Sequence, residues 1–135
     1  MRGIDSNILV YALNKDLPEH LPCKELLIDI VKGKELVSIP SIVFMESFHA
    51  LVKAFKYKEV EVKKRLVSLI DSKNLNVLDI STSSILFAFE IAEKYGTGGR
   101  DSLIAASLLE NKIQEIYSHD SDFDKILLLN RIDPI

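Results

Sequence analysis

Short apolar runs alternate along the chain with longer segments in which apolar residues recur every three or four positions. Short runs are typical of buried strands, and the longer spacing is typical of helices that cover a core with one face. Residues 3–13 are expected to begin as a strand and to continue as a helix. Further strands are predicted at residues 36–39, 75–80, 115–118 and around 132. Further helices are predicted at residues 23–32, 40–57, 59–71, 81–95, 100–112 and 122–127.

Strands that alternate with helices predict an α/β fold, a three-layer α/β/α sandwich with a mainly parallel central sheet. No internal repeat, low-complexity tract or linker interrupts the pattern, so residues 1–135 are expected to form a single domain. Local signals mark two helix starts. Pro40 suits the first turn of a helix, and Gly96, Gly98 and Gly99 form a loop before the helix at Arg100.

The composition excludes several classes of protein. Hydrophobic residues make up 47% and charged residues 27% of the chain, which excludes a disordered segment. Cys23 is the only cysteine, so the chain has no internal disulfide and no thiolate cluster for a metal. No apolar run approaches the roughly 20 residues of a membrane helix, and Asp5 interrupts what would be the apolar part of a secretion signal. We therefore expect a cytoplasmic protein that does not contact a membrane.

The net charge of −3 gives no overall electrostatic argument for binding nucleic acid. The segment from Lys53 to Arg65, however, has six basic and two acidic residues, which makes it +4 and the rest of the chain −7. A solvated helix face is the simpler interpretation. The alternative is a surface that binds a phosphate backbone beside an acidic site. The candidate RNA-binding residues are Lys53, Lys56, Lys63, Lys64 and Arg65, with Arg100 outside this segment.

Carboxylates stand at the places where a parallel sheet binds its ligands, beyond the carboxyl ends of the strands. Asp5 follows the first apolar stub, and Asp120 and Asp122 follow the strand predicted at residues 115–118. Asp101 lies in the first turn of the helix that the glycine loop opens. Each has a structural explanation as well, because helix caps, turns and first turns favour acidic residues.

Glu46 is the least expected of the acids, because it lies inside the apolar run Ile42–Phe48. Its neighbours one helical turn away include no basic residue, and Lys53 is two turns on. A buried carboxylate is costly unless it is paired, hydrogen-bonded or bound to a metal. A structural ion pair with a residue distant in the sequence therefore remains an alternative to a functional role.

Several carboxylates that converge without cysteines or clustered histidines are a ligand set for hard cations such as Mg²⁺ or Mn²⁺. Like charges at short range repel each other, so such a cluster requires a cation or shared protons. One or two ions held in this way activate water and neutralise charge on a phosphodiester. The acids thus predict a metal-dependent phosphodiester hydrolase.

At four segments the chain resembles the PIN-domain family, in particular toxins of the VapC type. The order and spacing of the segments agree over essentially the whole chain. They are Ile4–Tyr11, Ile39–Glu46, Gly99–Ala106 and Tyr117–Phe123. The resemblance implies a PIN-like fold and metal-dependent hydrolysis of single-stranded RNA. It also implies a homodimer and inhibition by a cognate antitoxin.

The resemblance further implies roles for individual residues. Asp5, Glu46 and Asp101 correspond to metal ligands and Asp120 to the fourth acid, while Asp122 corresponds to an accessory or water-mediated ligand. The residues implied to orient these carboxylates by hydrogen bonds are Ser6, Asn7 and Ser118. Two features depart from the family. Ser118 stands where Thr is more common, and Asp120, Asp122 and Asp124 compete as the fourth ligand.

Two other functions are compatible with these residues. An RNase H-like nuclease would use the same acids and metals, and strand order would distinguish it. A non-catalytic module on the same fold would bind RNA or an antitoxin without cutting. Metal-dependent cleavage of a generic single-stranded RNA separates that module from an enzyme.

Overall fold

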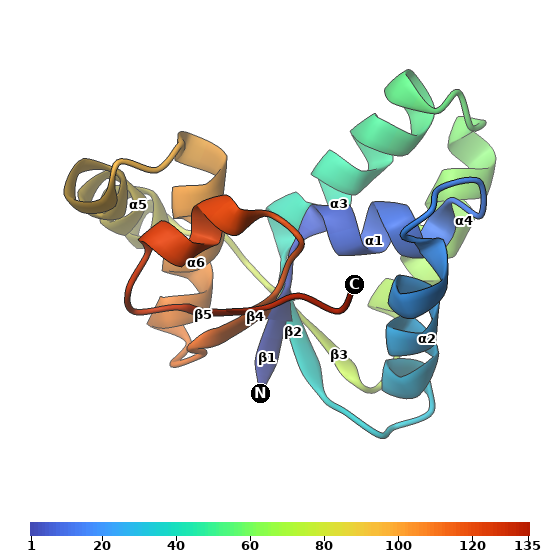
Figure 1. The fold of residues 1–135 in the computed structure, drawn as a ribbon, viewed down its shortest axis with the longest axis horizontal. Coiled ribbons are helices and arrows are strands. Elements are labelled where there is room, and N and C mark those ends of the chain that lie inside the picture. Colours follow the sequence, from blue (N-terminus) through green and yellow to red (C-terminus); the bar gives the residue numbers. More distant parts are fainter.

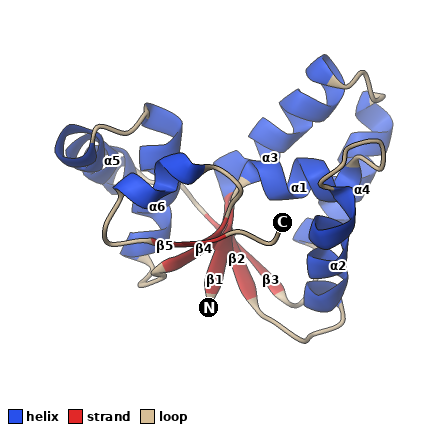
Figure 2. Cartoon of the chain, in the orientation of Figure 1, coloured by secondary structure: helices blue, strands red, loops and turns tan.

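The computed structural model describes residues 1–135, which form a five-stranded sheet with helices around it (Figure 1, Figure 2). All strand pairs are parallel, and the strand order is β3-β2-β1-β4-β5. The strands are β1 (Arg2–Ile4), β2 (Val37–Pro40), β3 (Leu75–Leu78), β4 (Glu115–Tyr117) and β5 (Asn130–Ile132). The α-helices are α1 (Ser6–Leu13), α2 (His20–Val31), α3 (Ser41–His49), α4 (Glu59–Ile70), α5 (Thr82–Tyr95) and α6 (Gly99–Glu110). A π-helix, η1 (Ala50–Ala54), and a 3₁₀-helix, η2 (Ser121–Lys125), complete the set.

Helices cover both faces of the sheet. The α5 and α6 helices pack against each other on one face, and α1, α2, α3 and α4 lie together on the other (Figure 1). The predicted three-layer sandwich is therefore confirmed, and its sheet is parallel throughout. None of the helices combines the length and the apolar character needed to cross a membrane.

The strand order places the end of β1 beside the end of β4. From β1 the chain builds the sheet outward through β2 and β3, and it later returns to the free side of β1 with β4 and β5. In the register of this pair Ile4 lies opposite Tyr117. Open parallel sheets bind ligands beyond the strand ends at the point where the direction of winding changes. In this protein that point lies directly before Asp5 and Ser118.

The central strands are buried between two helical layers. All four residues of β2 are buried, whereas β3 at the edge of the sheet has exposed positions. On β1, Gly3 allows an unusually close approach of α6, since a Cβ at this position would lie 2.5 Å from both methyl carbons of Leu108. The helix that carries Asp101 therefore packs directly against the strand that leads to Asp5.

The helix predicted over residues 40–57 differs at both ends from the observed one. Pro40 ends β2, where it lies opposite Leu78, and α3 begins at Ser41. After His49 the chain continues as a π-helix to Ala54, and Lys56 then adopts a φ of 63°. This left-handed conformation cannot continue a right-handed helix, so the helix ends before Tyr57.

Two other boundaries also differ from the predicted ones. The α2 helix begins at His20, earlier than the predicted start at Cys23. Pro22 lies in its first turn, where backbone N–H groups have no partner within the helix, so the proline breaks no hydrogen bond. The helix predicted at residues 122–127 is the shorter 3₁₀-helix η2.

The contact at Gly3 predicts a specific loss of stability. Gly3→Ala should lower the free energy of unfolding by about 1–3 kcal/mol, because Leu108 is fully buried and has no space into which to move. Gly99→Ala is the matched control, since nothing lies within 4 Å of a Cβ there. Urea unfolding followed by circular dichroism measures both. Equal stabilities of the two variants would contradict the close packing of α6 on β1.

Candidate metal centre

Four segments carry the predicted acids to the edge of the sheet where β1 and β4 end. Asp5 directly follows β1 and caps α1, because its Oδ1 accepts a hydrogen bond from the Ser6 N–H at 2.7 Å. Asp120 caps η2 by accepting from the Asp122 N–H at 2.9 Å. Asp101 lies in the first turn of α6, and Glu46 lies on α3. Helix ends favour carboxylates at such positions, so local hydrogen bonding helps to hold the acids in place.

Asp101, Asp120 and Asp122 form the tightest group of acids. One carboxylate oxygen of each residue lies within 4.8 Å of the others. Asp101 and Asp120 are half-buried, and Asp122 is exposed. Three negative charges at this spacing repel each other, and a divalent cation between them would replace repulsion with attraction. Since all the donors are carboxylate oxygens, the group fits Mg²⁺ or Mn²⁺.

Asp5 lies in the interior, with 5% of its surface exposed. The fully buried Ser118 donates from its Oγ to Asp5 Oδ2 at 2.8 Å, and the same Oγ accepts from the Asp120 N–H at 3.0 Å. Burial raises the pKa of Asp5 to about 6, although hydrogen bonds from Ser118 and Ser6 act to lower it. The charges of Glu46 and Asp120 raise this pKa further, so both acids lie within electrostatic range of Asp5.

The pKa of Asp101 is also about 6, and burial is again the main cause. The neighbouring charges of Asp120, Asp5 and Asp122 raise it further, and only Arg100 lowers it. Asp101 is therefore within electrostatic range of Asp5 as well as of Asp120 and Asp122. The two residues with pKa values near 6 come from opposite ends of the chain and share one electrostatic environment.

Glu46 forms an ion pair with Arg100, so the alternative that it pairs with a residue distant in the sequence is confirmed. The Arg100 Nε lies 2.9 Å from Glu46 Oε2. The other oxygen, Oε1, is buried and has no hydrogen-bond partner. Burial raises the pKa of Glu46, the charge of Arg100 lowers it, the charge of Asp101 raises it, and the Ser6 hydroxyl lowers it. Glu46 thus lies near Asp101 with one carboxylate oxygen unsatisfied, as a residue that binds a cation through that oxygen would.

The three aspartates near the end of the chain separate into two groups. Asp120 and Asp122 belong to the group described above, and Asp122 also pairs with Lys125 at 3.3 Å. Asp124 lies outside this group and accepts two hydrogen bonds from Arg131, at 2.9 and 3.1 Å. These bonds lower the pKa of Asp124. The role of Arg131 was not apparent from the sequence, since only strand pairing brings β5 alongside β4.

Two of the three residues expected to orient the carboxylates contact Asp5. They are Ser118, through its hydroxyl, and Ser6, through its backbone N–H and more distantly its hydroxyl. Asn7 differs from the expectation, because its Oδ1 accepts from the His119 N–H at 3.5 Å and it makes no hydrogen bond to a site carboxylate. The first turn of α1 directs this side chain toward the loop after β4. It therefore joins the two acidic segments indirectly.

The basic residues expected to bind RNA lie in two places. Arg100 is at the group of acids, and the others lie on η1, the following loop and α4, where all are exposed: Lys53, Lys56, Lys63, Lys64 and Arg65. Arg65 donates to the Leu13 carbonyl oxygen at 3.2 Å. The structure therefore brings only Arg100 of these six into contact with a predicted ligand.

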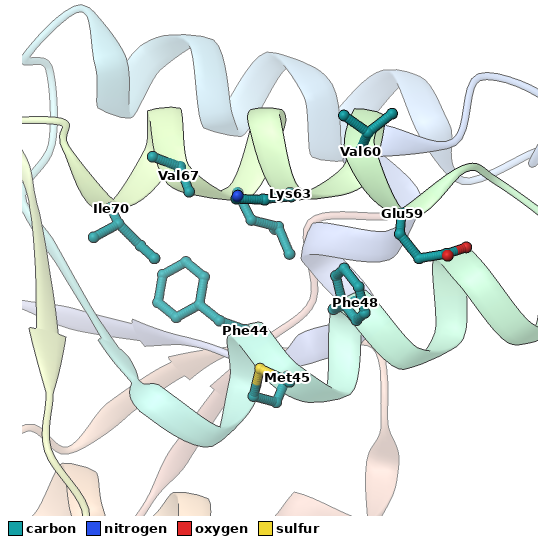
Figure 3. A pocket seen from close by; sticks show the side chains of 9 residues that line it. Phe44, Met45, Phe48, Glu59, Val60, Lys63, Val67 and Ile70 are labelled. Carbon is teal, nitrogen blue, oxygen red and sulfur yellow. The ribbon is translucent and has the colours of Figure 1, made fainter.

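The largest apolar hollow lies away from the acids, between α3 and α4 (Figure 3). It has a volume of about 440 Å³, and we call it the α3–α4 groove. Its lining residues are Phe44, Met45, Phe48, Glu59, Val60, Lys63, Leu66, Val67 and Ile70. None of the predicted ligands lines it, so the groove is separate from the acidic site.

Comparisons with known proteins agree with the fold. The PIN domain family matches residues 4–127. Ribonuclease VapC6 of Methanocaldococcus jannaschii is 25% identical over 142 residues, which cover 91% of this chain and 90% of that protein.

Two solved structures illustrate the shared fold. Mycobacterium tuberculosis VapC20, described as a Sarcin-Ricin loop cleaving toxin, superimposes with a TM-score of 0.77 at 16% identity over 92% of this chain and 93% of that chain. A toxin-antitoxin complex from Klebsiella pneumoniae contains a chain with a TM-score of 0.71 at 18% identity, over 100% of this chain and 98% of that chain.

The buried position of Asp5 predicts how stability depends on pH without metal. The pKa of Asp5 is about 6 in the folded protein against an ordinary value of 3.8, so the folded state binds more protons between these values. The free energy of unfolding in EDTA should therefore fall as pH rises from about 4 to about 6. Asp5→Asn should remove a share of this fall of the order of 1–3 kcal/mol.

Urea unfolding at several pH values measures the effect. Asp124→Asn is the matched control, since Arg131 lowers the pKa of Asp124, and its removal should not reduce the fall. A fall of the same size in wild type and Asp5→Asn would show that Asp5 ionises without difficulty in the folded protein.

Proposed function

Since this chain belongs to the PIN domain family, we propose that it is a metal-dependent endoribonuclease that hydrolyses single-stranded RNA. The observation that carries the proposal is the group of Asp101, Asp120 and Asp122, with carboxylate oxygens within 4.8 Å of one another. Asp5 and Glu46 adjoin this group electrostatically. The name of the M. jannaschii relative, a ribonuclease, supports RNA as the substrate.

The acids have different roles in the proposed centre. Asp5, Glu46, Asp101 and Asp120 hold one or two Mg²⁺ or Mn²⁺ ions, and the exposed Asp122 is an accessory ligand. A divalent ion bound there supplies charge neutralisation at the phosphodiester and lowers the pKa of water. Ser118 holds Asp5 and the Asp120 backbone through one hydroxyl, which fixes two ligands relative to each other.

The RNA is guided to the centre by positive charge. Arg100 is the basic residue beside the acids, and 75% of its side chain is exposed to an incoming strand. The exposed lysines of η1 and α4, with Arg65, lie on the other face of the sheet from α6 and contact a more distant part of the phosphate backbone without selecting a sequence. An acidic centre flanked by basic residues suits a polyanionic substrate whose scissile phosphate must approach carboxylates.

We further propose that the protein is the toxin of a toxin-antitoxin pair and forms a homodimer. The Klebsiella pneumoniae complex supports an antitoxin partner. The α3–α4 groove suits a segment of that partner, because a concave apolar surface accepts one face of a helix or peptide. The α5 helix instead exposes the protruding side chains Leu86 and Phe89, which suit a two-fold contact between copies.

Each of the two alternative functions is less well supported than the proposed enzyme. The family match accounts for the shared acids without an RNase H-like fold. A non-catalytic module that binds RNA or an antitoxin would not need three carboxylates within 4.8 Å of one another, and this grouping favours the enzyme.

The proposal predicts metal-dependent cleavage that fails without Asp101. Wild-type protein should cut a 5′-labelled single-stranded RNA in Mg²⁺ or Mn²⁺ and not in EDTA. Asp101→Asn should lower the rate by about 100-fold or more, since it removes a charge from the group that holds the ion. Asp29→Asn, which changes an exposed acid paired with Lys34 away from the centre, should cleave like wild type.

Gel analysis of the products at several times provides the rates, with circular dichroism to show that each variant is folded. Undiminished cleavage by Asp101→Asn and by Asp5→Asn would reject the proposed centre. RNA binding by the wild type without any cleavage would favour the non-catalytic module.

The antitoxin surface predicts a second pair of variants. Val60→Asp places a charge in the α3–α4 groove at a side chain that is 68% exposed, so it should block the complex without unfolding the chain. Phe89→Asp on α5 should leave that complex intact and weaken the homodimer. Co-expression with the small protein encoded immediately upstream, followed by size-exclusion chromatography with light scattering, tests both. Survival of the complex in Val60→Asp, or the lack of any such upstream reading frame, would count against this assignment.

A further inference from the structure

The ion pair of Arg100 and Glu46 joins two residues at the proposed metal centre, and its two partners differ sharply in environment. The side chain of Glu46 is 11% exposed, whereas that of Arg100 is 75% exposed. The arginine thus reaches from solvent onto a carboxylate that is fixed in the interior. The buried carboxylate stays in place, whereas the guanidinium can return to water and regain its full hydration.

The pair also satisfies only part of Glu46. Arg100 bonds Oε2 at 2.9 Å, and Oε1 is buried without any hydrogen-bond partner. Unsatisfied buried oxygens are rare and costly in proteins. Glu46 therefore has one oxygen paired with an exposed cation and the other buried without a partner, beside the half-buried Asp101.

The position of Arg100 on its own helix also favours an ion pair with Glu46. It lies in the first turn of α6, where the exposed N–H groups create a positive end that disfavours a cation. Its pairing with Glu46 offsets this unfavourable position. No such arrangement exists at Lys125 and Asp122, where both side chains are more than half exposed.

We propose that Arg100 is an exchangeable counter-ion for Glu46, which it holds in the metal-free protein and releases when the divalent ion takes Glu46. The released guanidinium then binds a phosphate of the RNA. Arg100 is therefore a positioning residue that competes with the metal before the substrate arrives and binds the substrate afterwards. This inference rests on the proposed metal-dependent function.

The exchange can be tested by metal binding alone. Isothermal titration with Mn²⁺ in the absence of RNA compares wild type, Arg100→Ala and Arg100→Lys. Removal of the competing cation in Arg100→Ala should tighten Mn²⁺ binding by roughly three- to tenfold. Arg100→Lys, which can still pair with Glu46, should remain close to wild type. Lys34→Ala is the control, because Lys34 makes an exposed ion pair with Asp29 at 3.3 Å away from the centre.

A double-mutant cycle separates the specific pair from the general field of the charge. In the Glu46→Gln background the effect of Arg100→Ala on Mn²⁺ affinity should shrink toward none, because the carboxylate for which both cations compete is gone. An effect of equal size in both backgrounds would assign it to the field of the guanidinium and overturn the exchange. Unchanged or weaker Mn²⁺ binding by Arg100→Ala would also overturn it.

The binding of the released Arg100 guanidinium to an RNA phosphate is measured separately. A fluorescent phosphorothioate single-stranded RNA, which resists hydrolysis, reports binding by anisotropy with and without Mn²⁺. Mn²⁺ should strengthen RNA binding in the wild type and in Arg100→Lys but much less in Arg100→Ala. Equal strengthening in all three would show that the guanidinium does not pass to the phosphate. Wild-type protein that binds no Mn²⁺ would instead reject the proposed function itself, whereas normal Mn²⁺ binding without any effect of Arg100 rejects only this inference.

Discussion

Mutual repulsion between carboxylates is the constraint around which the acidic end of this sheet is organised. Asp101, Asp120 and Asp122 bring oxygens within 4.8 Å of one another, and the buried Asp5 adds a further charge to the same field. Ordinary folding would not favour such a group, since each charge makes its neighbours harder to ionise. The folded chain tolerates it because caps, hydroxyls and one arginine each relieve part of the repulsion. The repulsion that remains between the carboxylates favours the binding of a cation.

The parallel sheet makes this arrangement possible with few residues. The ends of β1 and β4 adjoin, so that Asp5 and the loop before η2 meet without a long connection. Gly3 allows α6 to lie against β1 and brings Asp101 to the same edge. Ser118 then links Asp5 to the Asp120 backbone through a single hydroxyl. The rigid core therefore determines where the charges stand, and the polar side chains determine how they are oriented.

The sequence was sufficient to predict features that are local. Buried runs followed by an acid indicated Asp5 and Asp120, and the alternation of strands and helices predicted the three-layer fold. It was insufficient for the pair of Arg100 and Glu46, because its members lie on helices that meet only in the folded chain. The division of the third helix was missed for a different reason. Apolar spacing is similar in α- and π-helices over a single turn, and a positive φ at Lys56 has no signature in an apolar pattern.

The last strand also affects when the centre can form during synthesis. Arg131 on β5 donates to the Ser118 carbonyl oxygen at 3.2 Å and to Asp124 on η2, so it braces the segment that carries Asp120 and Asp122. A ribosome produces β1 and Asp5 first and this brace more than a hundred residues later. A nascent chain that has not yet released β5 therefore lacks the contacts of Arg131 that hold the segment with Asp120 and Asp122. Vectorial synthesis thus delays the ordering of these acids until β5 has emerged.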